Sequence, residues 1–341
     1  MKLAHRRATL RLAQPFTISR ATHVEEPVLW VEVSHEGVSG FGEAQPQEHY
    51  RETVEGAEAF LDEAAELLGD DPFALEAVGA RLAALPGNQA ARAALDGALH
   101  DLAGKLVGHP VWRLLGLERS GPPTSWTVWL GDPDDMARRA ERVDPRLRRL
   151  KLKLGGRDGL DVERVRAVRG VTDLPLQVDV NEYWEVDEAI DAVRQLADLG
   201  VQYVEQPLPA GDPGGARLKR ASPLPIYVDE DVHTLATVAA CADRAHGVNI
   251  KLAKSGGIRE AVRMIHAARA LGLGVMLGCM IESGLGIAAA AQIGSLCDHL
   301  DLDGNLLLAE DPWPGIELVD GVQLPSDRPG LGVHEAVSGA R

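Results

Sequence analysis

The 341-residue sequence has few aromatic side chains, few cysteines and few basic residues relative to acidic ones. Phe, Trp and Tyr make up 4% of the chain, which leaves little material for the stacking surfaces of single-strand-binding proteins. The formal net charge is -16, so a nucleic-acid backbone would be repelled unless basic residues gathered on one face. Only the short run 146–153 is a candidate for such a face. We therefore expect no nucleic-acid partner.

Disulfides and membrane spans are also not indicated. The three cysteines, Cys241, Cys279 and Cys297, have neither CxxC spacing nor the density of a disulfide framework, which favours a reducing compartment. No apolar run of signal-peptide length follows the N-terminus. The most apolar stretch, 271–296, is interrupted by Glu282 and by several glycines. These features predict a cytoplasmic protein without a membrane role, and a homo-oligomer is compatible with them.

The hydrophobic pattern changes along the chain. Strand-like apolar runs at 29–33 and 38–41 precede a segment with helical periodicity, 53–115. Eight short apolar runs then alternate with amphipathic stretches, at 126–130, 150–154, 176–180, 202–205, 226–228, 248–252, 274–277 and 299–302. This alternation predicts an α/β fold with a (β/α)8 (TIM-like) barrel over 121–310 and an α+β N-terminal capping domain over 1–120. The Pro- and Gly-rich tail, 311–341, is expected to pack back on the capping domain.

Charged side chains follow the ends of the expected barrel strands at regular intervals. Steps of 26, 26, 24 and 22 residues, each about one β/α unit, separate Lys153, Asp179, Glu205, Asp229 and Lys251. Barrel enzymes carry their active sites at the carboxyl ends of the strands, so these five groups are expected to converge. Any one carboxylate alone would more often be a helix cap or a turn residue, and the regular spacing is what favours a site.

The three carboxylates, Asp179, Glu205 and Asp229, predict a metal site. Crowded carboxylates repel one another and raise one another's pKa unless a cation neutralises them. Hard oxygen ligands suit Mg2+, with Mn2+ as the alternative.

Alternation in the segment 150–154, Leu-Lys-Leu-Lys-Leu, places Lys151 and Lys153 on one face. A solvated face of an edge strand is the commoner explanation, but a central barrel strand would turn both lysines inward, where they need counter-charges or a function. A neighbouring ammonium lowers the pKa of Lys153, which makes it a candidate base. Lys251 lies roughly across the barrel. For it and for nearby Lys254, a surface lysine at a strand end is the alternative.

Two lysines beside a metal can invert a carbon. One removes the proton next to a carboxylate from one face, and the other returns a proton to the opposite face. The proton is weakly acidic, and the metal stabilises the enediolate charge that develops.

Short motifs carry these residues in a fixed order: Lys-x-Lys at 151–153, Asp-x-Asn at 179–181, Glu-Gln-Pro at 205–207, Asp-Glu at 229–230, and Asn-Ile-Lys at 249–251 followed by Ser-Gly-Gly at 255–257. Gly-Phe-Gly-Glu-Ala at 40–44 and Pro-Gly-Leu-Gly at 329–332 extend the pattern over nearly the whole chain. The set resembles the muconate-lactonising subgroup of the enolase superfamily. The resemblance implies Lys153 and Lys251 as the acid/base pair, Lys151 as the partner of the substrate carboxylate, and Asp179, Glu205 and Asp229 as metal ligands.

Asp301 and Asp303 bear on which reaction of the subgroup is performed. Alternation places both carboxylates on one face, where they suit a substrate ammonium group, although a pair of capping or loop aspartates is the alternative. They resemble the Asp-x-Asp of dipeptide epimerases, which implies inversion at the Cα beside the C-terminal carboxylate of a dipeptide. The resemblance also implies a lid loop at 16–24 and three lining residues, Thr127, Cys279 and Ile281.

Arg20 in the loop 16–24 is expected to pair with an anionic second residue such as glutamate, or else to be an exposed arginine without a partner. Glu182 and Asp231 depart from the subgroup, which often has Gln-Gly-Trp after Asp-x-Asn and Ser after Asp-Glu. An added acid near the pocket would favour a cationic or neutral substrate.

Other functions stay open at this point. One alternative is an N-acylamino acid racemase, o-succinylbenzoate synthase or muconate cycloisomerase of the same subgroup, whose substrates lack the ammonium that would explain Asp301 and Asp303. The other is a non-catalytic barrel that only binds a ligand, which need not keep the lysines and carboxylates.

Overall fold

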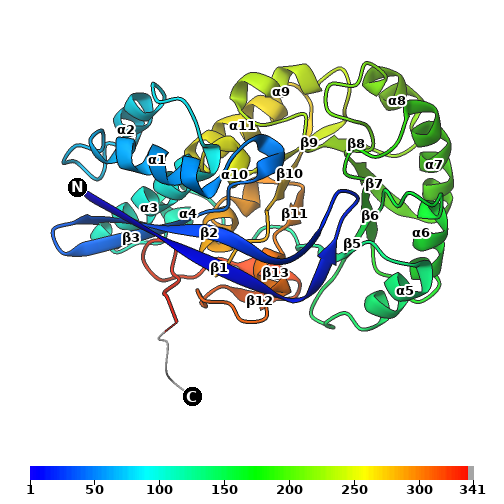
Figure 1. Cartoon of the computed structure of the whole chain (residues 1–341), viewed down its shortest axis with the longest axis horizontal. Coiled ribbons are helices and arrows are strands. Elements are labelled where there is room, and N and C mark those ends of the chain that lie inside the picture. The colour runs from blue at the N-terminus through cyan, green and yellow to red at the C-terminus, as the bar shows by residue number, and fades with distance from the viewer. Residues whose placement is uncertain (337–341) are drawn as a thin grey trace.

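The computed structural model describes residues 1–336 and shows a barrel beside a smaller α+β unit (Figure 1). The smaller unit contains the antiparallel sheet β1-β2-β3 and the helices that cover it. Its elements are β1 (Lys2–Thr17), β2 (Thr22–His35), β3 (Val38–Ala44), η1 (Glu48–Tyr50), α1 (Val54–Ala65), α2 (Leu75–Leu82), α3 (Gln89–Val107) and α4 (Val111–Leu114). Within residues 1–336, no helix combines the length and the apolar character needed to cross a bilayer.

Helix α3 packs closely on β3 because two glycines of that strand leave room for its backbone. A Cβ at Gly40 or Gly42 would overlap a carbonyl oxygen of α3, that of Ala98 or Ala94. The Asn88 side chain caps the helix by accepting a hydrogen bond from the Ala91 amide at 2.8 Å. The Gly-x-Gly of the 40–44 motif therefore serves packing within the smaller unit.

The barrel is an eight-stranded parallel sheet in the order β4 to β11. It nearly closes through a bridge between Thr124 and Leu300, where the Ser125 amide donates to the Leu300 carbonyl at 3.0 Å. Its strands are β4 (Trp126–Val128), β5 (Leu150–Lys153), β6 (Leu176–Asp179), β7 (Val201–Glu205), β8 (Ile226–Val228), β9 (Gly247–Lys251), β10 (Gly274–Gly278) and β11 (His299–Asp301). All eight lie where the apolar runs predict them, which confirms the expected barrel.

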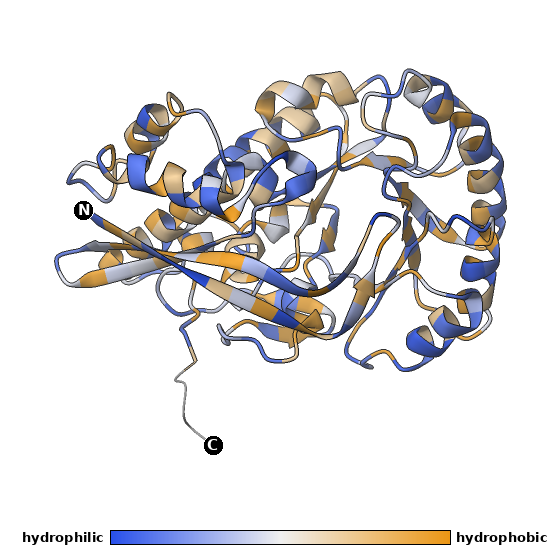
Figure 2. Ribbon diagram, viewed as in Figure 1, coloured by the Kyte–Doolittle hydropathy of each residue, from blue (hydrophilic) through white to orange (hydrophobic). Residues whose placement is uncertain are grey.

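Helices connect successive strands and form the outer layer: α5 (Pro133–Glu141), α6 (Asp161–Arg169), α7 (Val186–Asp198), α8 (Gly215–Ala221), α9 (Leu235–Cys241), α10 (Leu252–Ser255), α11 (Ile258–Ala270) and α12 (Gly284–Ala291). The 3-10 helix η2 (Gly294–Leu296) precedes β11, and η3 (Gly304–Leu307) follows it in place of an α-helix. In Figure 2 the strands β5 to β7 are largely hydrophobic, and the helices outside them carry hydrophilic residues on their outer faces.

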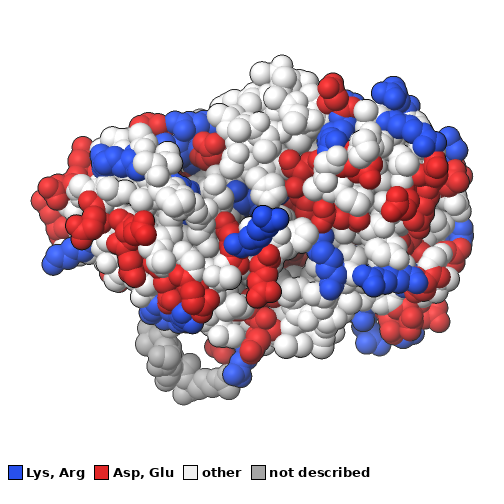
Figure 3. Space-filling view, turned by 45° about the horizontal axis from the view of Figure 1, so that its top comes forward, with Lys and Arg blue, Asp and Glu red and all other residues white. Residues whose placement is uncertain are grey.

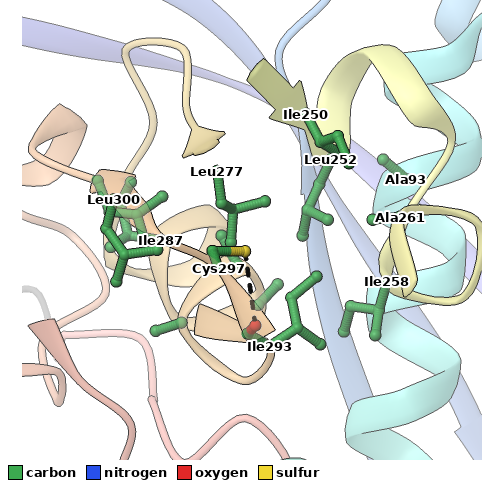
Figure 4. Close-up of a cluster of buried hydrophobic side chains, with 14 of the residues drawn as sticks. Ala93, Ile250, Leu252, Ile258, Ala261, Leu277, Ile287, Ile293, Cys297 and Leu300 are labelled. Atoms are coloured by element: carbon green, nitrogen blue, oxygen red, sulfur yellow. Dashed lines mark hydrogen bonds between the residues drawn. The ribbon is translucent and has the colours of Figure 1, made fainter. Parts of the chain in front are cut away.

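The core between the strands and the helices is formed by alternate strand residues, whose side chains point away from the barrel axis. Leu150, Leu152 and Leu154 pack with Val165 and Val168 of α6, as the alternation in this segment predicts. On the opposite side of the barrel, side chains of β9, β10 and β11 pack against α12, among them the labelled residues Ile250, Leu277, Leu300 and Ile287 (Figure 4). The opposite strand faces are thereby free to carry polar groups.

The expectations from sequence do not include β1, and the expected lid loop at 16–24 is a loop only over 18–21, since its flanking residues belong to β1 and β2. Ala8, Leu10 and Leu12 of β1 alternate with exposed Thr9 and Arg11, but this apolar alternation covers only a short part of the 16-residue strand, most of which is exposed or partly exposed. The segment 16–24 is the tip of the β1–β2 hairpin, in which Phe16 pairs with His23 and Thr17 with Thr22. Figure 1 shows this hairpin leaving the smaller unit and bending over the barrel opening.

The C-terminal segment contains the antiparallel pair β12 (Glu317–Val319) and β13 (Val322–Leu324). Its contacts with the smaller unit include a hydrogen bond and an aromatic pair. The Leu331 amide donates to Asp101 Oδ1 at 2.7 Å, and the Trp313 ring meets the Trp30 ring edge-on with 5.7 Å between centroids.

Many acidic side chains gather over the smaller unit, on the left of Figure 3.

Candidate active site

The pairing of the barrel strands places the predicted residues at the carboxyl end of the barrel, in two sets of neighbours on adjacent strands. Lys153, Asp179 and Glu205 are side by side on β5, β6 and β7. Lys251 and Asp301 are level on β9 and β11, with Gly278 of β10 between them. A Cβ at Gly278 would lie 2.7 Å from Asn249 Oδ1 and 3.1 Å from Lys251 Cε, so glycine leaves the space that these side chains occupy.

Each of the three predicted lysines is buried and bound to carboxylates. Lys151, 1% exposed, lies 2.7 Å from Asp301 Oδ2, 2.8 Å from Glu205 Oε2 and 3.0 Å from Asp179 Oδ2. Lys153 donates to Asp179 Oδ2 at 2.7 Å. Lys251 lies 2.8 Å from Asp229 Oδ2. The inward lysines of the Lys-x-Lys segment thus have the counter-charges that burial requires.

The pKa values of the carboxylates show where positive charge is lacking. Burial alone would raise the pKa of Asp179, but the ammonium groups of Lys151 and Lys153 outweigh it and lower the pKa. Lys251 and Lys254 do the same for Asp229. Burial and the neighbouring Asp179 raise the pKa of Glu205 to about 7. Lys151 is shared among three carboxylates, and Asp179 has Lys153 as a second cation, so Glu205 is less compensated than Asp179.

These three carboxylates fit a divalent cation. Glu205 is fully buried, and its Oε2 receives no hydrogen bond of good geometry although Lys151 Nζ lies 2.8 Å away. An uncompensated buried oxygen beside two further carboxylates is what a hard cation would satisfy. The residues present therefore suit Mg2+.

A second acidic group meets the distance requirement for a metal but already contains a cation. Ligand atoms of His49, Glu182 and Glu230 lie within 4.8 Å of one another. Arg20 Nη1 lies 3.1 Å from Glu182 Oε2 and 3.0 Å from Glu230 Oε1. This guanidinium lies where a metal ion would have to bind, so the group already has a cation of its own.

Asp301 and Asp303 both line the cavity at the barrel mouth. Asp303 Oδ2 accepts from the Thr127 amide at 2.7 Å, and Asp301 Oδ1 is buried without a hydrogen bond. Burial and the charge of Asp301 raise the pKa of Asp303 to about 7. An ammonium group between the two carboxylates would donate a hydrogen bond to Asp301 Oδ1 and would offset the repulsion that raises the pKa of Asp303.

The remaining predicted residues, Thr127, Cys279, Ile281 and Arg20, line the same cavity, whose volume is about 110 Å³. Arg20 is not exposed without a partner, because Glu182 and Glu230 bind it. A larger cavity of about 480 Å³ lies between α5 and Trp129 and contains none of the strand-end acids or lysines. Volume alone therefore does not locate the chemistry.

Several residues that hold the site were not singled out from the sequence. Lys254, treated as a surface lysine, is 2% exposed and donates to the Asp229 carbonyl at 2.6 Å. Asn249 Nδ2 donates to Glu205 Oε1 at 2.7 Å. Gln206 Oε1 accepts from the amides of Asp229 and Glu230, at 2.7 and 3.0 Å. Asn249 and Gln206 belong to the quoted motifs, which is the signal that could have found them.

Two family profiles cover most of the chain. Residues 2–116 match the N-terminal domain of the mandelate racemase / muconate lactonizing enzyme family, and residues 135–335 match the family described as enolase C-terminal domain-like. Among relatives, the L-Ala-D/L-Glu epimerase of Bacteroides thetaiotaomicron is 39% identical over 337 residues, which are 98% of this chain and 88% of the relative.

Solved structures of the same kind superimpose on the whole molecule. A substrate-liganded complex of the L-Ala-D/L-Glu epimerase from Bacillus subtilis gives a TM-score of 0.93 at 31% identity, covering 99% of this chain and 100% of that one. The dipeptide epimerase from Enterococcus faecalis, complexed with Mg and L-Leu-L-Tyr, gives 0.93 at 29% identity, covering 97% and 98%. The likeness therefore includes both units.

Proposed function

We propose that this chain, which belongs to the mandelate racemase / muconate lactonizing enzyme family of the enolase superfamily, is a Mg2+-dependent dipeptide epimerase. The observation that carries the proposal is the placement of Lys153 and Lys251 on either side of the carboxylates Asp179, Glu205 and Asp229. Relatives and structural neighbours named as dipeptide epimerases, one of them complexed with Mg and a dipeptide, support it.

The reaction moves one proton at the Cα beside the C-terminal carboxylate of the dipeptide. Mg2+ held by Asp179, Glu205 and Asp229 supplies electrostatic stabilisation of the negative charge that develops on the substrate carboxylate. One of Lys153 and Lys251 takes the proton from one face of the Cα, which leaves an enediolate, and the other donates a proton to the opposite face of that enediolate. The configuration at the carbon is thereby inverted.

Other side chains in the proposal bind and orient the substrate. Lys151 carries the positive charge that pairs with the substrate carboxylate. Its pairing partner on the neighbouring strand β6 is Gln177. Asp301 and Asp303 hold the α-ammonium group, and Thr127, Cys279 and Ile281 line the space for the rest of the dipeptide. Holding the reacting carbon between two lysines is itself a large part of the rate enhancement.

We further propose that the chain is divided into a capping domain at 1–120, a barrel at 121–310 and a C-terminal segment at 311–341. All three cysteines are free, which supports a cytoplasmic enzyme. The residues assigned to the reaction all come from one chain, and a homo-oligomer is compatible with this.

Proton NMR in D2O with Mg2+ and a panel of L,L-dipeptides tests the proposal. We expect loss of the Cα proton signal of the C-terminal residue and the appearance of a diastereomer. N-acetylated dipeptides, which lack the ammonium group, should react much more slowly. A Lys153→Ala/Lys251→Ala double variant, purified in parallel, controls for contaminating enzymes. Absence of exchange with every dipeptide would contradict the proposal.

A further inference from the structure

Glu182 lies where two segments of the smaller unit meet the barrel. Its Oε2 lies 3.1 Å from Arg20 Nη1, at the tip of the β1–β2 hairpin, and 3.1 Å from His49 Nε2, in η1. Its Oε1 accepts from the Ala210 amide at 2.9 Å, and its own amide donates to the Gln206 carbonyl at 2.8 Å. Barrel loops therefore fix this carboxylate, which binds both overlying segments.

The barrel surface beneath the hairpin tip is shaped to receive it. Ser19 Oγ donates to the Asn181 carbonyl at 3.2 Å, and Arg20 Nη1 donates to the same oxygen at 3.3 Å. Gly155, with φ of +83°, leaves room for this approach, because a Cβ there would lie 2.9 Å from the Cβ of Ser19 and 2.8 Å from that of Tyr183. In Figure 1 the tip lies over the barrel opening near β6 and β7.

The η1 segment has a second contact with the barrel. The Tyr50 ring meets the His233 ring edge-on, with 4.8 Å between centroids. Burial and the charge of Arg20 lower the pKa of His49, so its contact with Glu182 does not depend on a protonated imidazole. Glu182 is thus shared by both segments that cover the cavity.

The charges around Arg20 bear on substrate choice. Two carboxylates, Glu182 and Glu230, face this one guanidinium. The other cationic groups among the described residues lining the cavity are also engaged. Lys151, Lys153 and Lys251 bind the strand-end carboxylates, and His23 contacts Glu26. An acidic substrate side chain would lose water here and meet no uncompensated cation.

Building on the proposed dipeptide epimerase function, we infer that Glu182 is a positioning residue that fastens the hairpin tip and η1 over the cavity, and that the enzyme consequently discriminates against an acidic residue at the epimerised position. Arg20 then belongs to the closure and is not the receptor for an anionic side chain that the sequence suggests. This specificity would differ from that of the relatives named for glutamate.

Glu182→Gln tests the inference, because glutamine keeps the acceptor for the Ala210 amide and removes the charge. Glu185→Gln is the matched control: Glu185 is exposed in the same loop and caps no amide with its side chain. One readout is kcat and KM for L-Ala-L-Gln and L-Ala-L-Glu, which differ little in shape. The second is hydrogen–deuterium exchange of 16–23 and 48–50 without substrate, which does not depend on catalysis.

We expect wild type and Glu185→Gln to favour L-Ala-L-Gln by about tenfold or more in kcat/KM. Glu182→Gln should reduce this preference about fivefold or more, raise KM more than it lowers kcat, and speed exchange at 16–23 and 48–50. A wild-type preference for L-Ala-L-Glu, or unchanged exchange in Glu182→Gln, would overturn the inference. If wild type epimerises no dipeptide, the proposed function fails, and exchange alone decides whether Glu182 fastens the two segments.

Discussion

Lys153 and Lys251 end strands β5 and β9, which stand opposite each other in the barrel. The strands between them on one side are β6, β7 and β8, and on the other β10, β11 and β4. The three carboxylates Asp179, Glu205 and Asp229 come from the ends of β6, β7 and β8. A substrate bound with its reacting Cα between the two strands would therefore present opposite faces of that carbon to different lysines.

Metal removal should abolish the reaction reversibly. Dialysis against EDTA is expected to stop α-proton exchange, and Mg2+ should restore it, because Glu205 and its neighbours lack sufficient positive charge without a cation. Glu205→Gln should lose more than about 100-fold in Mg2+ affinity by titration calorimetry. Full activity of the EDTA-treated wild type would contradict the metal assignment.

Asn249 is expected to act through Glu205. It donates to Glu205 Oε1 at 2.7 Å, so Asn249→Leu removes a hydrogen bond that orients a metal ligand. We expect a loss of roughly 10- to 100-fold in Mg2+ affinity, with activity partly recovered at high Mg2+ concentration. A circular-dichroism melt serves as the control for folding. Unchanged affinity in a folded variant would show that this hydrogen bond does not orient the ligand.

Asp303 should recognise the substrate ammonium. Asp303→Asn is expected to lower kcat/KM for a free dipeptide by roughly 10- to 100-fold, the usual cost of losing a charged hydrogen-bond partner. The same change should have little effect on the slow reaction of the N-acetylated dipeptide. Steady-state kinetics with both substrates measures the difference, and equal losses for the two would contradict this role.

His100 should make stability depend on pH. Burial alone would lower its pKa, but the Asp96 carboxylate, 3.4 Å from Nδ1, outweighs burial and raises it. A raised pKa gives stabilisation that is complete below about 6.5 and is lost as pH rises through the folded-state pKa. Wild type should therefore have a larger free energy of unfolding than His100→Gln at low pH. This difference should become smaller between pH 6 and 9, by at most about 1.4 kcal/mol per pH unit.

Urea unfolding of both proteins across that range checks the prediction. Asp96, whose pKa is lowered, stays ionised between pH 6 and 9 and adds no slope of its own. A difference between the two proteins that does not change with pH would show that His100 is not protonated in the folded state.

Strand alternation and spacing were sufficient to predict the barrel and the convergence of its strand-end groups. Strands β5 to β9 end on a charged residue, or are followed at once by one, about one β/α unit after the last, and a parallel barrel leaves one edge where these residues can meet. In the 150–154 segment, alternation alone separates the buried leucines from the inward lysines. These relationships are local in sequence or fixed by the fold.

Other features depend on segments that are distant in sequence. Glu182 and Glu230, the partners of Arg20, lie 162 and 210 residues away from it, and no local pattern indicates which acids the hairpin tip will meet. Lys254 looks like an ordinary lysine after a strand, and only the turn into α10 brings it to Asp229. Strand β1 is mostly exposed, and its apolar alternation is confined to Ala8, Leu10 and Leu12, which is too short to indicate a 16-residue strand.

Exchange catalysed by the single-lysine variants tests the two-lysine account most directly. Lys153→Ala and Lys251→Ala should be incubated separately in D2O with Mg2+, each with the L,L- and the L,D-diastereomer of one dipeptide. Neither variant should epimerise. Each should exchange the α-proton of one diastereomer only, and the two variants should differ in which one, because each retains the lysine on one face. Exchange of the same diastereomer by both, or persistent epimerisation by either, would contradict the account.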